Sequence, residues 1–305
     1  MKELHIGISG WRYAPWRGDF YPEGLRQRDE LRYASRAFNS IELNGSFYAL
    51  QTPERYRQWA GDTPEHFCFS IKGPRYITHI KRLREPREGL ANFFASGPLE
   101  LGDKLGPLLW QLPPSLVYDE ALVEAFLALL PDRADAALAL ARRWATRPPS
   151  HWPKPLGERR LRHAMEVRHP SFVTPRFAEQ LRRHGVALVI ADAPRKWPYA
   201  EDLTAKDFVY LRLHGDKQLY ASGYDADALE RWRERIEHWR HGLQPTDAEL
   251  LDSGVRGDRH PREVFCYFDN DLKVRAPYDA SRLMALLDLR LPERQEPGAP
   301  AGDWS

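Results

Sequence analysis

The feature that most constrains the fold of this chain is a repeated alternation of two patterns. Short runs rich in β-branched and aromatic residues recur, and a segment of helical periodicity follows each run. Repeated units of this kind form parallel sheets, and eight strands close a (β/α)8 barrel. The eight runs are residues 4–9, 40–44, 66–72, 107–112, 163–168, 186–191, 208–214 and 263–268. The sequence therefore predicts an α/β fold, a TIM barrel of eight parallel strands, as a single domain over residues 1–290.

Two of the intervening helices carry clear end signals. Thr52 is the expected N-cap of the first, with Pro53 at its first position and Gly61 after its last turn. The second is predicted over residues 225–242, and one apolar stripe on it is expected to pack on the sheet. The stripe consists of Leu229, Trp232, Ile236 and Trp239.

Two long connections follow predicted helices, so we expect them as insertions on the barrel face opposite the active end. They are residues 141–161 and 243–262. The first is basic and is interpreted as a solvated loop, with contact to a polyanion as the alternative. Its charged residues are Arg142, Arg143, Arg147, Lys154, Glu158, Arg159 and Arg160. Residues 291–305 are rich in proline and glycine and are expected to form a disordered C-terminal tail.

The composition narrows the class of protein. Lys and Arg number 45 against 43 Asp and Glu, and a net charge of +2 does not mark an obligate nucleic-acid binder. Without a membrane-spanning apolar run or a signal-peptide pattern, we expect a cytoplasmic protein with no membrane partner. Cys68 and Cys266 lie in separate apolar runs and are expected to be free thiols. No pattern indicates an oligomeric state.

The candidate site residues come from the C-terminal ends of the predicted strands, because these ends surround the open mouth of a barrel. Side chains alternate along a strand, so polar residues two apart point to one face. The expected catalytic residues are Glu42, Glu166, Asp192 and His214. The expected substrate-binding residues are Trp11, Asn44, Tyr48, Lys72, Gln111, Arg168, His169, Arg212 and Asn270.

These residue types fit a small anionic substrate, either phosphorylated or carboxylated. The cations Lys72, Arg168 and Arg212 suit phosphate or carboxylate oxygens, and a guanidinium matches such oxygens with two hydrogen bonds. The carboxylates then supply the general acid or base. The structural alternative is a buried ion-pair layer that only holds the barrel together.

A divalent metal is a competing interpretation. Glu42, Glu166, Asp192 and His214 offer oxygen and imidazole ligands, but no local metal-binding spacing supports this, and nearby cations would repel the ion. No metal ligand is therefore assigned, and a divalent metal stays possible. The chain also lacks a Walker loop, a G-x-G-x-x-G turn and a G-x-S-x-G elbow, so no nucleotide or dinucleotide cofactor is predicted.

Aromatic and basic residues are interleaved in the long loops that follow the strands. They are interpreted either as lids that stack a sugar or nucleobase, or as simple caps on the barrel. The aromatic residues are Trp11, Tyr13, Trp16, Phe20, Tyr21, Phe47, Tyr48, Tyr76, Trp197, Tyr199, Tyr220 and Tyr224. The basic residues are Arg12, Arg17, Arg75, Lys81, Arg82, Arg195, Lys196 and Lys217.

A set of short motifs in fixed order resembles the YecE-like family, called domain of unknown function 72, over residues 4–289. They include Gly7-Ile8-Ser9-Gly10-Trp11, Glu42-Leu43-Asn44, Ser46-Phe47-Tyr48, Ile77-Thr78-His79, Gln111-Leu112-Pro113-Pro114, Glu166-Val167-Arg168-His169, Arg212-Leu213-His214-Gly215 and Tyr267-Phe268-Asp269-Asn270. The resemblance implies a TIM barrel and no assigned reaction. Relatives commonly carry two asparagines where this chain has Asp269 and Asn270, and the extra carboxylate is expected to weaken anion binding locally.

Three functions follow from these patterns. The first is an enzyme, a hydrolase, isomerase or lyase, that acts on a small anionic compound in the barrel mouth. The second, by analogy of fold with endonuclease IV, is a nucleic-acid binder or phosphodiester hydrolase, possible but not favoured at near-neutral charge. The third is a non-catalytic protein that binds a metabolite.

Overall fold

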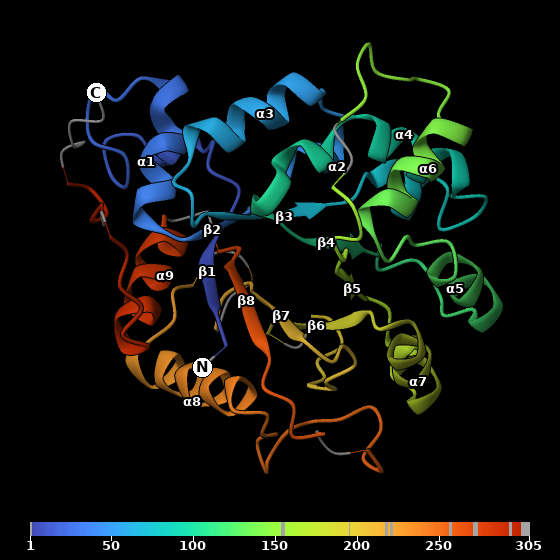
Figure 1. Ribbon diagram of the computed structural model, residues 1–305. Coiled ribbons are helices and arrows are strands. Elements are labelled where there is room, and N and C mark those ends of the chain that lie inside the picture. The colour runs from blue at the N-terminus through green and yellow to red at the C-terminus, as the bar shows by residue number, and fades with distance from the viewer. Residues whose placement is uncertain are drawn as a thin grey trace.

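A computed structural model describes residues 2–153, 156–194, 196–216, 219, 222–255, 258–270, 274–292 and 295–299. Its eight strands pair in parallel, each with the next along the chain, and the last pairs with the first to close a barrel (Figure 1). The strands are β1 (Leu4–Ser9), β2 (Ser40–Leu43), β3 (Cys68–Lys72), β4 (Leu105–Gln111), β5 (His163–Glu166), β6 (Ala187–Asp192), β7 (Phe208–Leu213) and β8 (Glu263–Phe268). The predicted TIM barrel is confirmed.

The predicted runs match the strands to within two residues at either end, and the differences fall partly at the active end. β2 ends at Leu43 and β5 at Glu166. Asn44 and Arg168 therefore lie in the loops that follow the strands, where their side chains have more freedom to point away from the barrel axis.

Helices join most of the strands and cover the outside of the barrel (Figure 1). They are α1 (Glu30–Ala37), α2 (Gly45–Tyr48), α3 (Pro53–Asp62), α4 (Arg87–Ala95), α5 (Glu120–Leu127), α6 (Ala134–Trp144), α7 (Pro175–His184), α8 (Ala226–Arg240) and α9 (Arg275–Leu286). Short 3-10 turns span Ala14–Trp16, Gln27–Asp29, Pro98–Lys104 and Pro170–Phe172, and one π-helical turn spans Tyr76–Ile80.

The β6–β7 connection corrects the expectation that a helix follows every strand. No helix forms in its described part, residues 193–194 and 196–207. Pro194 and Pro198 have no backbone N–H to donate to a helix. Thr204 instead ties the segment to β6, because its Oγ1 accepts a hydrogen bond of 2.7 Å from a backbone N–H of that strand.

The end signals of the two chosen helices are mostly confirmed. Thr52 caps α3 by accepting a hydrogen bond from Arg55 N, and Pro53 begins the helix. Gly61 does not follow the last turn as expected, since α3 continues to Asp62. The predicted stripe of α8 is buried, and Asp225 caps that helix at its N-terminus.

The inside of the barrel is partly polar. Ser40 Oγ and Tyr267 Oη lie 2.7 Å apart, and Ser70 Oγ and Tyr210 Oη lie 2.6 Å apart. All four side chains are buried. Because buried hydroxyls need partners, these pairs fix the inward direction of their strands and carry hydrogen bonds up to the active end.

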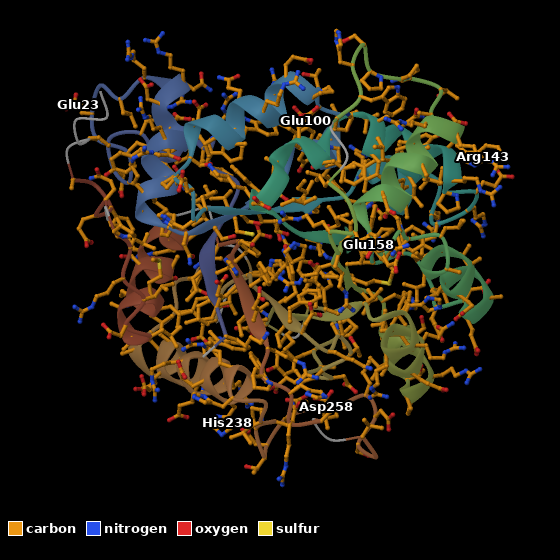
Figure 2. The ribbon with its side chains drawn as sticks, in the orientation of Figure 1. Glu23, Glu100, Arg143, Glu158, His238 and Asp258 are labelled. Atoms are coloured by element: carbon orange, nitrogen blue, oxygen red, sulfur yellow. The ribbon has the colours of Figure 1, made fainter. Side chains whose placement is uncertain are left out.

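Both predicted insertions lie on the N-terminal face of the barrel. Arg159 bonds to Asp103 and to the backbone of Leu105, where β4 begins. The second insertion runs below α8, where Asp258 is labelled, whereas Arg143 of the first projects outward from α6 (Figure 2). The neighbouring Lys154 lies outside the described residues.

The C-terminal segment differs from the expected disordered tail where the structure describes it. Gln295 N donates to Arg36 O, and Gly298 N donates to Phe20 O. Tyr33 Oη donates to the backbone oxygens of Glu296 and Ala299 at 2.9 and 2.8 Å. Residues 295–299 are thus held against α1 and Phe20 through their own backbone groups, which their side-chain composition does not reveal.

Cys68 and Cys266 are both buried and free, as predicted. In the part of the chain that the structure describes, no helix combines the length and the apolar character that crossing a membrane requires.

Candidate functional site

Arg212 lies at the centre of a buried ion layer at the C-terminal end of the barrel. Its Nη2 donates to Glu42 Oε1 at 2.9 Å, and its Nη1 donates to Glu166 Oε2 at 2.6 Å. Nη2 also lies 2.9 Å from Asp269 Oδ2. Glu166 pairs in addition with Arg168, whose Nε lies 2.7 Å from Glu166 Oε1. These five residues, which we call the ion layer, come from β2, β5 and β7 and from the loops after β5 and β8.

Glu42 is held from all sides within this layer. Ser9 Oγ donates to Glu42 Oε1 at 2.5 Å, and Tyr210 Oη donates to Oε2 at 2.7 Å. Arg212 adds one hydrogen bond to each of the two oxygens. Because each carboxylate oxygen already accepts two hydrogen bonds, Glu42 has no lone pair aimed at a substrate.

Glu166 and Asp269 stay ionised. Burial alone would raise the pKa of Glu166, but the guanidiniums of Arg168 and Arg212 outweigh it and hold that pKa well below its usual range. For Asp269, burial likewise raises the pKa, but Arg212 and His214 lower it by more than burial raises it. The net shift of that pKa is therefore downward. Both side chains are poor proton donors and weak bases at neutral pH.

His214, the residue after β7, lies directly against the ion layer. Its Nδ1 lies 3.0 Å from Asp269 Oδ2, and the edge of the ring meets Trp197 with the centroids 5.1 Å apart. Burial lowers the pKa of His214, with Arg212 acting in the same direction. The imidazole is therefore expected to be neutral and to orient Asp269.

A cavity of about 900 Å³ opens above one side of the ion layer, over the loops that follow β1, β2 and β3. Its lining is rich in cations and aromatic rings. The cations are Arg12, Arg55, Lys72, Arg75 and Arg168, and the rings belong to Trp11, Tyr13, Phe47, Tyr48, Trp59 and His79. Among the described lining residues the only carboxylate is that of Asp269, which already pairs with Arg212. The cavity therefore carries an excess of positive charge.

Lys72 ends β3 at the floor of this cavity. Its side chain is 9% exposed, and its Nζ lies 4.4 Å from the centre of the Phe47 ring. Ser46 Oγ donates to Lys72 O at 2.7 Å, and the next residue must be Gly73 because a Cβ there would lie 2.4 Å from the Trp110 ring. Burial and the charge of Arg212 lower the pKa of Lys72 to about 8. A fixed backbone thus presents an amine that loses its proton easily.

His79 lies on the π-helical turn beside Lys72. Its Nδ1 lies 2.8 Å from Thr78 Oγ1, and its ring meets Phe47 edge-on with the centroids 5.0 Å apart. Burial, with Lys72 and Arg168 adding to it, lowers the pKa of His79 to about 4. The ring is neutral at pH 7 and offers the cavity a hydrogen bond without charge.

Arg168 and Asn44 present further polar groups. The guanidinium carbon of Arg168 lies 3.6 Å from the centre of the Trp197 ring, which fixes its plane. Asn44 Nδ2 donates to Ser9 Oγ at 3.2 Å, and within the described structure its Oδ1 accepts no hydrogen bond. An unsatisfied amide oxygen at a cavity wall is a position for a ligand donor or a water.

The structure divides the predicted site residues into three groups. Those that line the cavity are Trp11, Asn44, Tyr48, Lys72, Gln111 and Arg168. Those that lie in or directly against the ion layer beneath it are Glu42, Glu166, Arg212 and His214, together with the cavity-lining Arg168.

The third group, Asp192, His169 and Asn270, is absent from the described cavity lining. Asp192 accepts a hydrogen bond from Tyr224 at 2.9 Å, and burial raises its pKa to about 6. His169 caps the 3-10 turn Pro170–Phe172, and Asn270 donates to Asp279 at 2.8 Å. These contacts stabilise loops, so proximity to a strand end alone did not place a side chain in the mouth.

Sequence reasoning left several lining residues out of the site. Arg55 and Trp59 lie in the first turns of α3, which start at the active end because the helix follows β2. This position and their spacing of four residues would have indicated them. His79 stood only in a family motif. Asp269, which was expected to weaken anion binding, lines the cavity and pairs with Arg212.

The four residues considered for a divalent metal are not assembled as a ligand set. In the described chain, a group of three ligand atoms within 4.8 Å of one another occurs at Glu3, His5 and Glu263, on the opposite face. Glu263 there receives two hydrogen bonds from Arg162, at 2.7 and 2.8 Å. A guanidinium in that position competes with a cation for the same oxygens.

Comparisons with known proteins agree on the family. The family model described as "Protein of unknown function DUF72" matches residues 5–302. The chain is 24% identical to the UPF0759 protein YunF of Bacillus subtilis, over 94% of this chain and 95% of that protein. It is 29% identical to the UPF0759 protein YecE of Escherichia coli, over 62% of this chain and 59% of that protein.

Solved structures show the same fold. A DUF72 family protein from Thermotoga maritima matches with a TM-score of 0.70 at 23% identity, covering 94% of this chain and 99% of that one. A DUF72 family protein from Enterococcus faecalis matches with a TM-score of 0.66 at 17% identity, covering 94% and 96%. The eight-stranded barrel and the match to the family model over nearly its whole length together place this chain in the DUF72 family.

Proposed function

We propose that this protein is an enzyme that binds a small phosphorylated or carboxylated compound in the cavity above the ion layer. One observation carries the proposal: of the five cations that line the cavity, Arg12, Arg55 and Arg75 form no ion pair with any described carboxylate. Gathering like charges in a half-enclosed space is unfavourable unless an anion neutralises them.

The chemistry proposed for the site uses acid and base groups other than those the sequence favoured. Glu42 and Glu166 are both paired with Arg212, so we assign them a positioning role. Lys72, with a pKa near 8, can release and take up a proton close to neutral pH. His79 stays neutral and can hold a substrate oxygen.

The aromatic walls fit the non-ionic part of such a compound. Trp11 and Trp59 meet edge-on with centroids 5.6 Å apart on one wall, and Tyr48 is 70% exposed at the rim. Rings in these positions can stack a sugar or a planar group while the cations hold phosphate or carboxylate.

Calorimetric titration with inorganic phosphate tests the anion site. Arg75→Gln and Arg168→Gln are each expected to weaken binding about tenfold or more, because each removes a charge-assisted hydrogen bond. Arg176→Gln, an exposed position on α7 outside the described lining, is the matched control and should bind as the parent does. Equal affinity in all four proteins would refute the anion site.

Incubation of the protein with a cell extract separates catalysis from storage. Depletion of an anionic metabolite with a new product supports an enzyme, whereas retention of an unchanged compound supports the binding-protein alternative. A gel shift of single-stranded DNA that weakens steeply with salt would favour the nucleic-acid alternative instead.

A further inference from the structure

We propose that Lys72 forms a covalent imine with the carbonyl carbon of an anionic aldehyde or ketone bound in the cavity. This inference rests on the proposed function, since the cations of the cavity would hold the anionic end of the compound. It adds a substrate class, α-keto acids or phosphorylated carbonyl compounds, and a nucleophile.

The surroundings of Lys72 are those of a reactive amine, as a comparison with Lys104 shows. Lys104 Nζ donates to the backbone oxygens of Ala60 and Thr63 at 2.5 and 2.6 Å, which is how a structural lysine satisfies its charge. Lys72 Nζ forms no hydrogen bond or ion pair with any described residue and meets only the Phe47 ring. Its side chain is nine-tenths buried and lines the cavity.

The charge of the ion layer suits an imine at this position. The layer holds three carboxylates and two guanidiniums, and burial keeps the adjacent His214 neutral. One negative charge is left over, and one cation above the layer balances it. Either the ammonium of Lys72 or a protonated imine supplies that cation, so the reaction does not disturb the buried charges.

Lys72 also has the protonation state that the reaction needs. A pKa near 8 leaves about a tenth of the amine neutral at pH 7, against well under a thousandth for a lysine of ordinary pKa. The neutral amine is the nucleophile, and a lysine shielded from solvent beside another cation is one way by which proteins obtain it.

The chemical step balances without a further reactant. The nitrogen of Lys72 adds to the carbonyl carbon, and its proton moves to the carbonyl oxygen to give a carbinolamine. The oxygen then leaves as water with the second nitrogen-bound hydrogen, and a C=N double bond remains. A proton from solvent converts this imine to its cationic form, and no electrons are exchanged.

Borohydride trapping on the intact protein tests the imine. The probes are pyruvate and dihydroxyacetone phosphate, with lactate and glycerol 3-phosphate as matched anions that lack the carbonyl group. Reduction should fix an adduct that peptide mass mapping assigns to Lys72 among the nine lysines of the chain. Lys72→Arg should abolish the adduct, whereas Lys81→Arg, a partly exposed position in the segment that follows β3, should keep it.

The outcomes separate this inference from the proposed function. An adduct at Lys72 in the parent at least about tenfold above that at Lys81, with either carbonyl probe, supports the imine. Phosphate binding without an adduct at Lys72 overturns the imine and leaves the anion site standing. An adduct without phosphate binding keeps the imine and refutes the anion site, and absence of both refutes both. Mapping on the parent protein makes the result independent of whether Lys72→Arg folds.

Discussion

The two ends of the barrel carry cavities of nearly equal size, but only the C-terminal one has an excess of one charge among its described lining residues. The cavity at the C-terminal end measures about 900 Å³ and the one at the N-terminal end about 860 Å³. The N-terminal cavity has as many acidic as basic lining residues among those described. They are Glu3, Glu65, Asp103, Glu263 and Asp288 against Lys2, Arg159, Arg162, Arg240 and Arg290. The two cavities therefore differ in charge balance and hardly in volume.

The buried arginines at the two ends show the same contrast. At the N-terminal end, Arg162 pairs with Glu263 at 2.7 Å and with Asp207 at 3.0 Å, and all three side chains keep about a fifth of their surface exposed. At the C-terminal end, Arg212 is 1% exposed and binds three carboxylates. The first cluster can be stabilised by solvent, whereas the second depends on its own members and on Lys72.

The largest effect is expected from removing the central arginine of each end. Arg212→Met leaves buried carboxylates without a partner and should lower the free energy of unfolding by about 3–5 kcal/mol. Arg162→Met, whose partners reach solvent, should cost about 2 kcal/mol. Urea denaturation followed by circular dichroism measures both. Equal losses would show that the two clusters do not differ in desolvation.

An acid titration sharpens the comparison at the N-terminal end. Burial opposes ionisation of Glu263, but hydrogen bonds from His5 and Arg162 lower its pKa to about 2, below the unfolded value of 4.5. Its stabilisation is present above pH 4.5 and is lost as the pH falls towards 2. Allowing for solvent screening, Glu263→Gln should remove about 2 kcal/mol of pH-dependent stability in that window. An unchanged acid limb of the stability curve would contradict this assignment.

Binding at the C-terminal end is expected to depend on pH in the opposite range. The pKa of Lys72 near 8 lies below the ordinary lysine value of 10.5, so the amine loses its charge as the pH rises from 7 to 9. Phosphate affinity should fall about tenfold or less across this range, since other cations stay charged. In Lys72→Met the affinity should be lower and flat over the same range. Calorimetric titration at several pH values checks both curves.

The smallest effect is expected far from either cavity. Asp225 caps α8 by accepting a hydrogen bond of 2.9 Å from Ala228 N. Asp225→Ala should lower the free energy of unfolding by about 1 kcal/mol and leave phosphate binding unchanged. A binding change larger than twofold in this variant would show that stability and affinity are coupled, and would weaken the interpretation of the other variants.

Some of the site could be predicted from sequence because strand periodicity carries it. Glu42, Glu166 and Arg212 follow the inward phase of their strands, so their convergence follows once the barrel closes. Lys72 follows the same rule at the end of β3. Asp192 also ends a strand, yet it bonds to Tyr224 and does not line the described cavity.

What the pattern could not predict depends on contacts between distant segments. Arg55 and Trp59 reach the cavity because α3 packs where the loop after β2 places it. Asp269 is paired at the cavity because Arg212, 57 residues away in the sequence, donates to it. The helix-free β6–β7 connection and the bonded segment 295–299 likewise depend on partners that no local signal names.

The sequence by itself determined the eight-stranded barrel, the two insertions and the polar character of the active end, because these follow from residue periodicity and short-range end signals. The tertiary structure decided which charges are paired and which remain available to a ligand. That distinction rests on distances of a few ångströms between side chains from separate strands, and electrostatic energy depends on such distances and on burial rather than on residue type alone.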